Sequence, residues 1–295
     1  MRIMPAPGRS PQAGEPDGGP AWKNRAMNSV PTAPRLPRHH LPIATGVLIA
    51  INVGVWLLQV VAGHVSPIHA SSAALISWGG DLPLYTLTGD TWRLLTAMFL
   101  HGGIVHVGLN MYVLAFTAPL VEYEFGTGRM LAIYFAGGLL ASCASVFWAV
   151  LRATPADPAA LVTVSVGASG AVMALFGSLL AGLVLPTPRF AHLPKHMQPG
   201  INKGLIQAVV INVGMGFLIQ GVDNSAHVGG LLGGLVLGLL MAMAPAATSP
   251  RDTLMRYLAA AGLVAVCVGA LLHSGAKPWM PYLRAEFAAE LRFQH

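Results

Sequence analysis

The chain alternates between long apolar stretches and shorter polar segments. Seven of these stretches run for 17 to 23 residues each. A helix needs about 20 residues to cross about 30 Å of hydrocarbon, and only helices satisfy their own backbone groups there without closing a barrel. The pattern therefore predicts an all-α, polytopic membrane protein. The predicted spans are 41–63, 103–121, 129–151, 169–185, 203–220, 225–244 and 253–273.

Two long segments lie outside these spans. Residues 1–40 contain eight prolines and little apolar content, which predicts a disordered, basic tail. Residues 64–102 mix leucines and aromatic residues with few charges, so we expect this loop to lie partly in the membrane interface. We thus expect three parts: the tail 1–40, a core of six spans at 41–245, and a seventh span with a C-terminal tail at 246–295.

Composition and charge narrow the class. The chain has 295 residues, of which 54% are hydrophobic and 9% charged, whereas soluble domains carry about 25% charged residues. An ordinary soluble protein is therefore excluded. If the N-terminus lies inside, twelve of the seventeen Lys and Arg residues fall on the inner side, as the positive-inside rule requires. We interpret the net charge of +6 as this topology signal and expect no nucleic-acid partner.

Candidate chemistry begins with Ser169 and His227, which lie near the outer starts of the fourth and sixth spans. A serine hydroxyl is a weak nucleophile without a base beside it, and an ionisable residue within a span is a functional candidate by default. His106 is the other histidine within a span. Small residues follow each candidate at helical spacing and predict close packing of the two helices. These residues are Gly170, Ala174, Gly177 and Ala181 after Ser169, and Gly230, Gly234 and Gly238 after His227.

The alternative is that both stripes serve packing only and that His227 bonds a carbonyl group. Asp223 precedes His227 by four residues, so it could orient the imidazole as a third catalytic member. An Asp in this position is more often a helix N-cap, and we favour that interpretation. The predicted catalytic unit is therefore a Ser–His dyad.

His106 and Asn110 are four residues apart and share one face of the second span. They could join helices by hydrogen bonds, or they could donate to the oxyanion of an acyl-transfer intermediate. Backbone N–H groups at the start of the fourth span would add donors, and Gly167 has no side chain to block the approach.

No metal or cofactor is expected. His192 and His196 flank Leu-Pro-Lys in an inner loop with no Glu between them, which does not fit the zinc-protease motif. The two cysteines, Cys143 and Cys267, lie in separate apolar spans without metal-ligand spacing, so we interpret both as small buried hydrophobes.

Three motifs in order carry a specific resemblance. The runs His101–Asn110 (HGGIVHVGLN), Gly167–Gly170 (GASG) and Ala226–Gly230 (AHVGG), together with Trp92-Arg93 in the outer loop, resemble the rhomboid family of intramembrane serine proteases. The resemblance spans roughly 41–245. Each motif alone is weak, but the full set, with each motif on its proper span, is very specific.

The resemblance implies that Ser169 is the nucleophile, that His227 is the base, and that His106, Asn110 and the backbone at Gly167 and Ser169 form the oxyanion site. It implies that the outer loop lies partly in the membrane, that span 5 and the loop after it act as a gate, and that the substrates are single-span transmembrane proteins cut near their outer end.

Six core spans plus one C-terminal span is a variant known in the family, and it differs from the mitochondrial arrangement. We expect an integral protein of a bacterial inner membrane with a cytoplasmic N-terminus. One position departs from the family pattern. Many members carry an aromatic residue four positions after the nucleophile, where this chain has Met173.

Two other functions remain as alternatives. One is a catalytically weak or inactive rhomboid-like protein that binds membrane clients. Loss of Ser169 or His227 would have supported this alternative. The other is a small-molecule transporter, which is expected to show paired repeats or charged residues at mid-membrane, and neither pattern is present.

Overall fold

The computed structural model describes residues 42–185, 198–218, 222–242 and 249–292. The chain divides into two units, 1–41 and 42–295, and the description below concerns the second. The predicted disordered tail and the loop with His192 and His196 lie outside the described residues.

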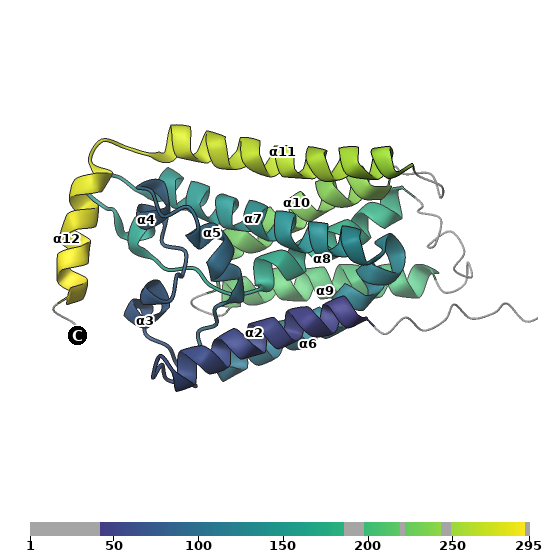
Figure 1. Cartoon of the computed structure of the whole chain (residues 1–295), viewed down its shortest axis with the longest axis horizontal. Helices are drawn as coiled ribbons and strands as arrows, with labels where there is room; N and C mark the ends of the chain where they lie inside the picture. The colour runs from purple at the N-terminus through teal and green to yellow at the C-terminus, as the bar shows by residue number, and fades with distance from the viewer. Residues whose placement is uncertain (1–41, 186–197, 219–221, 243–248, 293–295) are drawn as a thin grey trace, which may run out of the picture. The chain divides into compact units, whose positions relative to one another are not determined.

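Seven long helices coincide with the seven predicted spans to within about five residues at either end (Figure 1). Five of them are long and apolar enough to cross a membrane: α2, α6, α7, α10 and α11. Helix α8 is apolar but shorter, and α9 is not among those five. The all-α polytopic prediction is thus confirmed. The helices are α2 (Ile43–Val61), α6 (Ile104–Phe125), α7 (Thr127–Arg152), α8 (Ser169–Val184), α9 (Gln198–Leu218), α10 (Asn224–Ala242) and α11 (Pro250–Gly275).

Helix α6 extends one turn beyond the predicted end of the second span at residue 121. Glu122 and Glu124 belong to its last turn. The Glu122 carboxylate is tolerated there because it accepts hydrogen bonds from Thr45 (3.2 Å) and Thr127 (2.7 Å). Gly126, with φ of +86°, then ends the helix.

Helix α11 begins three residues before the predicted start. The hydroxyl oxygen of Ser249 caps it by accepting from the backbone N–H of Asp252 (3.1 Å), and the hydroxyl also donates to the Asp252 carboxylate (2.9 Å). Pro250 occupies the first turn, where its missing N–H costs nothing. The cap therefore fixes the start of the helix.

The outer loop is folded rather than extended. It contains three short helices and a 3₁₀ turn: α3 (Ser72–Ser77), α4 (Pro83–Leu87), α5 (Arg93–Thr96) and η1 (Ala97–Phe99). The side chain of Arg93 is buried and donates to the carbonyls of Ile76 (2.7 Å) and Gly80 (3.0 Å). These bonds hold the two halves of the loop together. A second 3₁₀ turn, η2 (Ala159–Val162), packs in one apolar cluster with residues of α4 and α5.

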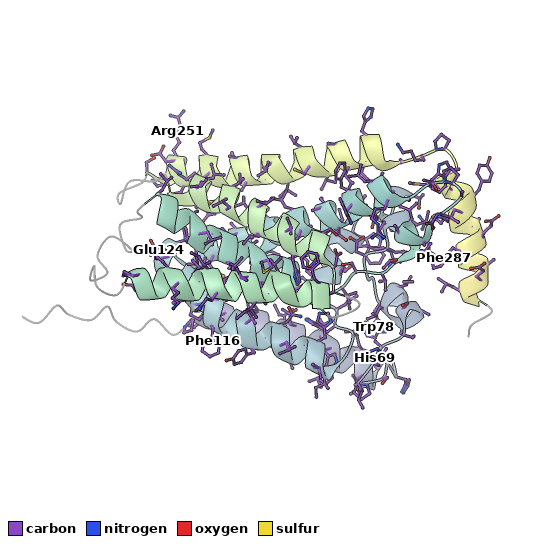
Figure 2. All side chains as sticks on the ribbon, turned by 180° about the vertical axis from the view of Figure 1, so that it is seen from behind. His69, Trp78, Phe116, Glu124, Arg251 and Phe287 are labelled. Carbon is purple, nitrogen blue, oxygen red and sulfur yellow. The ribbon has the colours of Figure 1, made fainter. Side chains whose placement is uncertain are left out.

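A further helix, α12 (Met280–Arg292), was not predicted. Figure 2 labels Glu124 and Arg251 near one end of the long helices, and His69, Trp78 and Phe287 of α12 near the other. The folded outer loop and α12 therefore lie at the same end. Helix α8 is almost wholly buried and packs against α7 and α10, so residues at its start lie inside the bundle.

Candidate active site

Ser169 is the first residue of α8 and is half-buried. Gly167, two residues earlier, has φ of +122°, a conformation that side chains rarely adopt. Its N–H donates to the carbonyl of Ala97 (2.9 Å), which ties this turn to the outer loop. Backbone N–H groups in the first turn of a helix have no partner within the helix, so they are available to an anionic group beside Ser169.

The stripes of small residues bring α8 and α10 into direct backbone contact, as predicted. Gly230 lies against the backbone of Gly170, and Gly234 against the backbone of Ala174. A Cβ atom on Gly170 would also lie 3.8 Å from the carbonyl oxygen of Ala226, the residue before His227. Ser169 and His227 are thus each adjacent to the point where the two helices cross.

His227 is buried in the first turns of α10. Within the described part of the chain, its Nδ1 atom has no hydrogen-bond partner, while the backbone of Asn212 on α9 lies within hydrogen-bonding reach of the ring. The described residues include no hydrogen bond between Ser169 and His227. Such bonds are often long before substrate binds, so the geometry leaves an imidazole nitrogen free to act as a base.

Asp223 caps α10, which confirms the favoured interpretation. Its Oδ1 accepts from the backbone N–H of Ala226 (3.0 Å) and from the hydroxyl of Ser225. Its Oδ2 accepts from the hydroxyls of Ser165 (2.8 Å) and Ser145. Both carboxylate oxygens are therefore occupied by partners other than the imidazole of His227.

Burial alone would raise the pKa of Asp223, but these four hydrogen bonds outweigh it and hold the pKa below the ordinary value for Asp. The carboxylate therefore stays ionised. It interacts with His227 through its charge, without a hydrogen bond to the ring.

His106 lies one turn into α6 and faces Gly167. Its Nδ1 accepts from the backbone N–H of Gly102 (3.2 Å), so in the neutral ring the proton is on Nε2. A Cβ atom built on Gly167 would be 2.7 Å from that Nε2 atom. The Nε2–H donor is thus directed at the space that the missing side chain of Gly167 leaves open.

Asn110 is buried one turn further along the same face of α6. Its Nδ2 donates one hydrogen to the carbonyl of His106 (3.0 Å), and the second remains for another acceptor. A Cβ atom on Gly167 would be 3.7 Å from this Nδ2. Two side-chain donors therefore converge beside Gly167, two residues before Ser169 in the chain.

His101 begins the run His101–Asn110 that resembles the rhomboid family, but no role of its own was assigned to it from the sequence. It is 1% exposed and packs edge-on against His106, with ring centroids 5.1 Å apart. Burial, and then the neighbouring His106, lower the pKa of His101 to about 3, so the ring is neutral. Its place in that run, five residues before His106, was a signal, but its burial depends on the fold of the outer loop and could not be read from sequence.

Sequence reasoning also missed a polar network behind the turn. The backbone N–H of Asp81 donates to the carbonyl of Ser165 (3.0 Å), and the N–H of Ser165 donates to the carbonyl of Asp81 (2.8 Å). The hydroxyl of Ser165 in turn donates a hydrogen bond to Asp223. The alternation of polar and apolar residues in Thr163–Val166 was a weak signal for this extended segment. Asp81 and Asp223, the partners of Ser165, are too distant in sequence to be recognised from this pattern.

Comparison with known proteins decides the family. The model of the rhomboid domain matches residues 88–244, more than half of the 295 residues. The chain belongs to the rhomboid family. It is a family of intramembrane proteases, and the matched region contains α5 to α10 with every candidate site residue.

Several curated relatives are similar over long stretches. Rhomboid protease GluP of Bacillus subtilis (strain 168) is 31% identical over 236 residues, which cover 79% of this chain and 41% of the relative. Rhomboid protease AarA of Providencia stuartii is 29% identical over 205 residues, covering 67% of this chain and 72% of the relative. RHOMBOID-like protein 4 of Arabidopsis thaliana is 34% identical over 176 residues, covering 59% and 40%. The chain therefore spans about two fifths of the length of the first and third of these rhomboid proteins.

Proposed function

We propose that this rhomboid-family chain is an intramembrane serine endopeptidase in which Ser169 and His227 form the catalytic dyad. The observation that carries the proposal is the convergence of His106 Nε2 and Asn110 Nδ2 on Gly167, two residues before a serine at the start of a buried helix. The packing of α8 against α10 supports the pairing of that serine with His227.

The reaction follows from these positions. The Ser169 hydroxyl attacks the scissile carbonyl carbon while His227 takes its proton. The carbonyl oxygen becomes an oxyanion, which accepts hydrogen bonds from His106 Nε2, Asn110 Nδ2 and the backbone N–H of Ser169. His227 then gives its proton to the leaving amine, and the C–N bond breaks to leave an acyl-enzyme. Water, activated by the same imidazole, releases the second product.

Among the described residues we assign no carboxylate to the third place of a triad. Asp223 has both oxygens occupied by serine hydroxyls and a backbone N–H, so its part is to start α10 and thereby place His227. Its negative charge nevertheless favours the imidazolium that forms when His227 accepts the proton.

We further propose that the substrates are single-span transmembrane proteins cut near their outer end. We place the protein in a bacterial inner membrane with a cytoplasmic N-terminus. The excess of Lys and Arg at one end of the predicted spans supports this orientation. In that orientation the folded outer loop and the start of α8 face the outer side.

The test is cleavage of a single-span substrate in proteoliposomes by two alanine variants of α8. Ser169→Ala should abolish cleavage, because it removes the proposed nucleophile. Ser178→Ala is the matched control, since among the described residues its buried hydroxyl donates only to the carbonyl of Leu175 in the same helix (2.8 Å), and it should cleave like the wild type. Full cleavage by purified Ser169→Ala would refute the dyad.

A further inference from the structure

The C-terminal helix α12 packs one face on the outer loop. Residues on that face, at helical spacing, join the apolar cluster that contains Leu84, Tyr85 and Leu87 of α4. The opposite face of α12 is exposed. The residues that pack on the loop are Met280, Leu283, Phe287 and Leu291. Figure 1 shows α12 beside α4. Helix α12 lies beyond residue 244, where the rhomboid-domain match ends.

Arg284 is the polar contact at the centre of this face. Its Nη1 donates to the carbonyl (3.0 Å) and the hydroxyl (2.8 Å) of Thr88, and its Nη2 donates to Asp90 Oδ2 (3.0 Å). The guanidinium carbon lies 4.6 Å from the centre of the Tyr85 ring, and Phe287 meets the same ring edge-on at 6.3 Å. Arg284 thus fixes the turn 88–90 that connects α4 to α5.

The same carboxylate oxygen connects Arg284 to Arg93. Asp90 Oδ2 also accepts from Arg93 Nε (3.3 Å), and the Arg93 guanidinium lies 5.1 Å from the Tyr85 ring centre. Two arginines, one from α12 and one from the rhomboid domain, therefore share one carboxylate and one aromatic ring. Because both guanidinium groups are at least two-thirds buried, this pairing is screened less than a pair on the open surface.

Arg93 in turn is connected to the turn that precedes Ser169 by two routes. Its Nη1 bonds the carbonyl of Gly80, and the next residue, Asp81, pairs its backbone with Ser165. Arg93 also begins α5, which continues into η1, where the Ala97 carbonyl accepts the N–H of Gly167. The segment 165–167 is thus held at both ends by the part of the loop that Arg93 organises.

We propose that Arg284 is a positioning residue for hydrolysis: by holding Asp90 and Arg93 from the C-terminal helix, it fixes the outer loop at which Gly167 is bound beside His106 and Asn110. This inference rests on the proposed function. It assigns α12 a part in the reaction although α12 touches no reacting atom.

The test compares Arg284→Gln, Arg284→Lys and the matched control Glu286→Gln, which alters an exposed residue two positions away on α12. Turnover of a single-span substrate is measured in proteoliposomes and divided by the number of sites that react with a fluorophosphonate, so that unfolded protein is not counted. Arg284→Gln should lower kcat about tenfold with KM within about twofold, because small displacements of reacting groups lower the rate more than binding. Lys should restore part of the loss, since it keeps the charge near Asp90 but loses the planar fork. Glu286→Gln should equal the wild type.

Asp90→Asn provides an independent variant should Arg284→Gln fold poorly. It should lower kcat by a similar factor, and the double variant should be no slower than the slower single variant, because both changes break one connected unit. Hydrogen exchange of the segment around Gly167 should speed up in both single variants and not in Glu286→Gln.

The proposal is overturned if Arg284→Gln and Asp90→Asn both keep wild-type kcat per reactive site. It is also overturned if their losses multiply in the double variant. Failure of the proposed function looks different: the wild type itself would then neither react with the fluorophosphonate at Ser169 nor cleave the substrate.

Discussion

At the scale of single residues, Gly167 has little freedom to change. Its φ of +122° favours glycine, and its open side faces the two side-chain donors of the proposed oxyanion site. A side chain at this position would therefore both strain the backbone and close the proposed oxyanion site. This makes Gly167 a sharper probe of the site than either donor alone.

Gly167→Ala should lower kcat by at least about 10²-fold, the cost of losing one oxyanion donor in soluble hydrolases. The reason is that the new methyl group would come within 2.7 Å of His106 Nε2 and occupy the place of the oxyanion. The measurement is kcat on a single-span substrate, expressed per folded molecule, with the folded fraction determined by thermal unfolding.

Gly108→Ala is the matched control, since a Cβ atom there meets nothing within 4 Å. Both substitutions add one methyl group, and only Gly167→Ala fills the space beside His106. Equal kcat values for the two variants would count against an oxyanion site at this position.

At the scale of helices, the contact between α8 and α10 brings Ser169 and His227 into proximity. Gly234→Ala should lower the free energy of unfolding by about 1–3 kcal/mol, because its methyl group would overlap the backbone of Ala174, which cannot move aside as a flexible side chain could. The measurement is thermal or denaturant unfolding in detergent micelles. Gly262→Ala on α11, where a Cβ atom meets nothing within 4 Å, should be neutral or slightly stabilising. If both variants unfold alike, the close packing of α8 against α10 does not contribute to the free energy of unfolding.

Much of the helix packing could be predicted from the sequence. The small-residue stripes after Ser169 and His227 gave the pairing of α8 and α10, because small residues at helical spacing have few other uses in a membrane. The predicted end of the second span, at residue 121, falls one turn short of the end of α6, because Thr45 and Thr127 provide Glu122 with partners that local sequence does not reveal.

Helix α12 was missed for a different reason. It has 13 residues and an amphipathic pattern, so a search for apolar stretches passes over it. Its stability comes from contacts with Tyr85 and Asp90, almost 200 residues earlier. The network of Asp81, Ser165 and Asp223 is equally non-local, so the sequence predicted candidate side chains for the site but not the contacts that hold the surrounding turn.

At the scale of the whole molecule, Asp81 connects the outer loop to the helix bundle and should make stability depend on pH. Burial, above all, raises the pKa of Asp81 to about 7; the nearby Asp223 adds to this, while Thr86 and Arg93 oppose it. Its Oδ1 accepts from Thr86 (2.6 Å), and its Oδ2 has no partner within the described residues.

Because the folded pKa is above the unfolded value of 3.8, the folded protein holds a proton that the unfolded chain releases. The associated stability is fully present below about pH 4 and is lost as the pH rises through 7. With about three units of difference, the loss is on the order of 4 kcal/mol.

Asp81→Asn should therefore gain stability relative to the wild type as the pH rises from 5 to 8, since an amide cannot ionise and can still accept from Thr86. Thermal midpoints at the two pH values measure this, with Glu286→Gln as the control that should follow the wild type at both. A constant difference between Asp81→Asn and the wild type would show that Asp81 does not titrate in this range.

The proposed site lies inside a helix bundle, which sets a requirement on substrates. A transmembrane helix has its carbonyls already bonded, so the scissile segment must unwind first. Gly or Pro near the cut lowers that cost by roughly 1 or 3 kcal/mol relative to Ala in a helix interior. Cleavage of a single-span substrate should rise with such residues near its outer end and fall when they are replaced by Leu. A proteoliposome series tests this, and equal rates, or faster cleavage of a soluble unfolded chain, would contradict it.

The central claim is that Ser169 is a nucleophile activated by His227, and covalent labelling tests it most directly. The purified wild type is treated with a fluorophosphonate, and the modified residue is located by mass spectrometry. The account predicts a phosphonyl group on Ser169 Oγ, with fluoride released, and predicts that His227→Ala loses this reaction while Ser178→Ala keeps it. An adduct on another residue, or labelling of Ser169 at the wild-type rate in His227→Ala, would contradict the account.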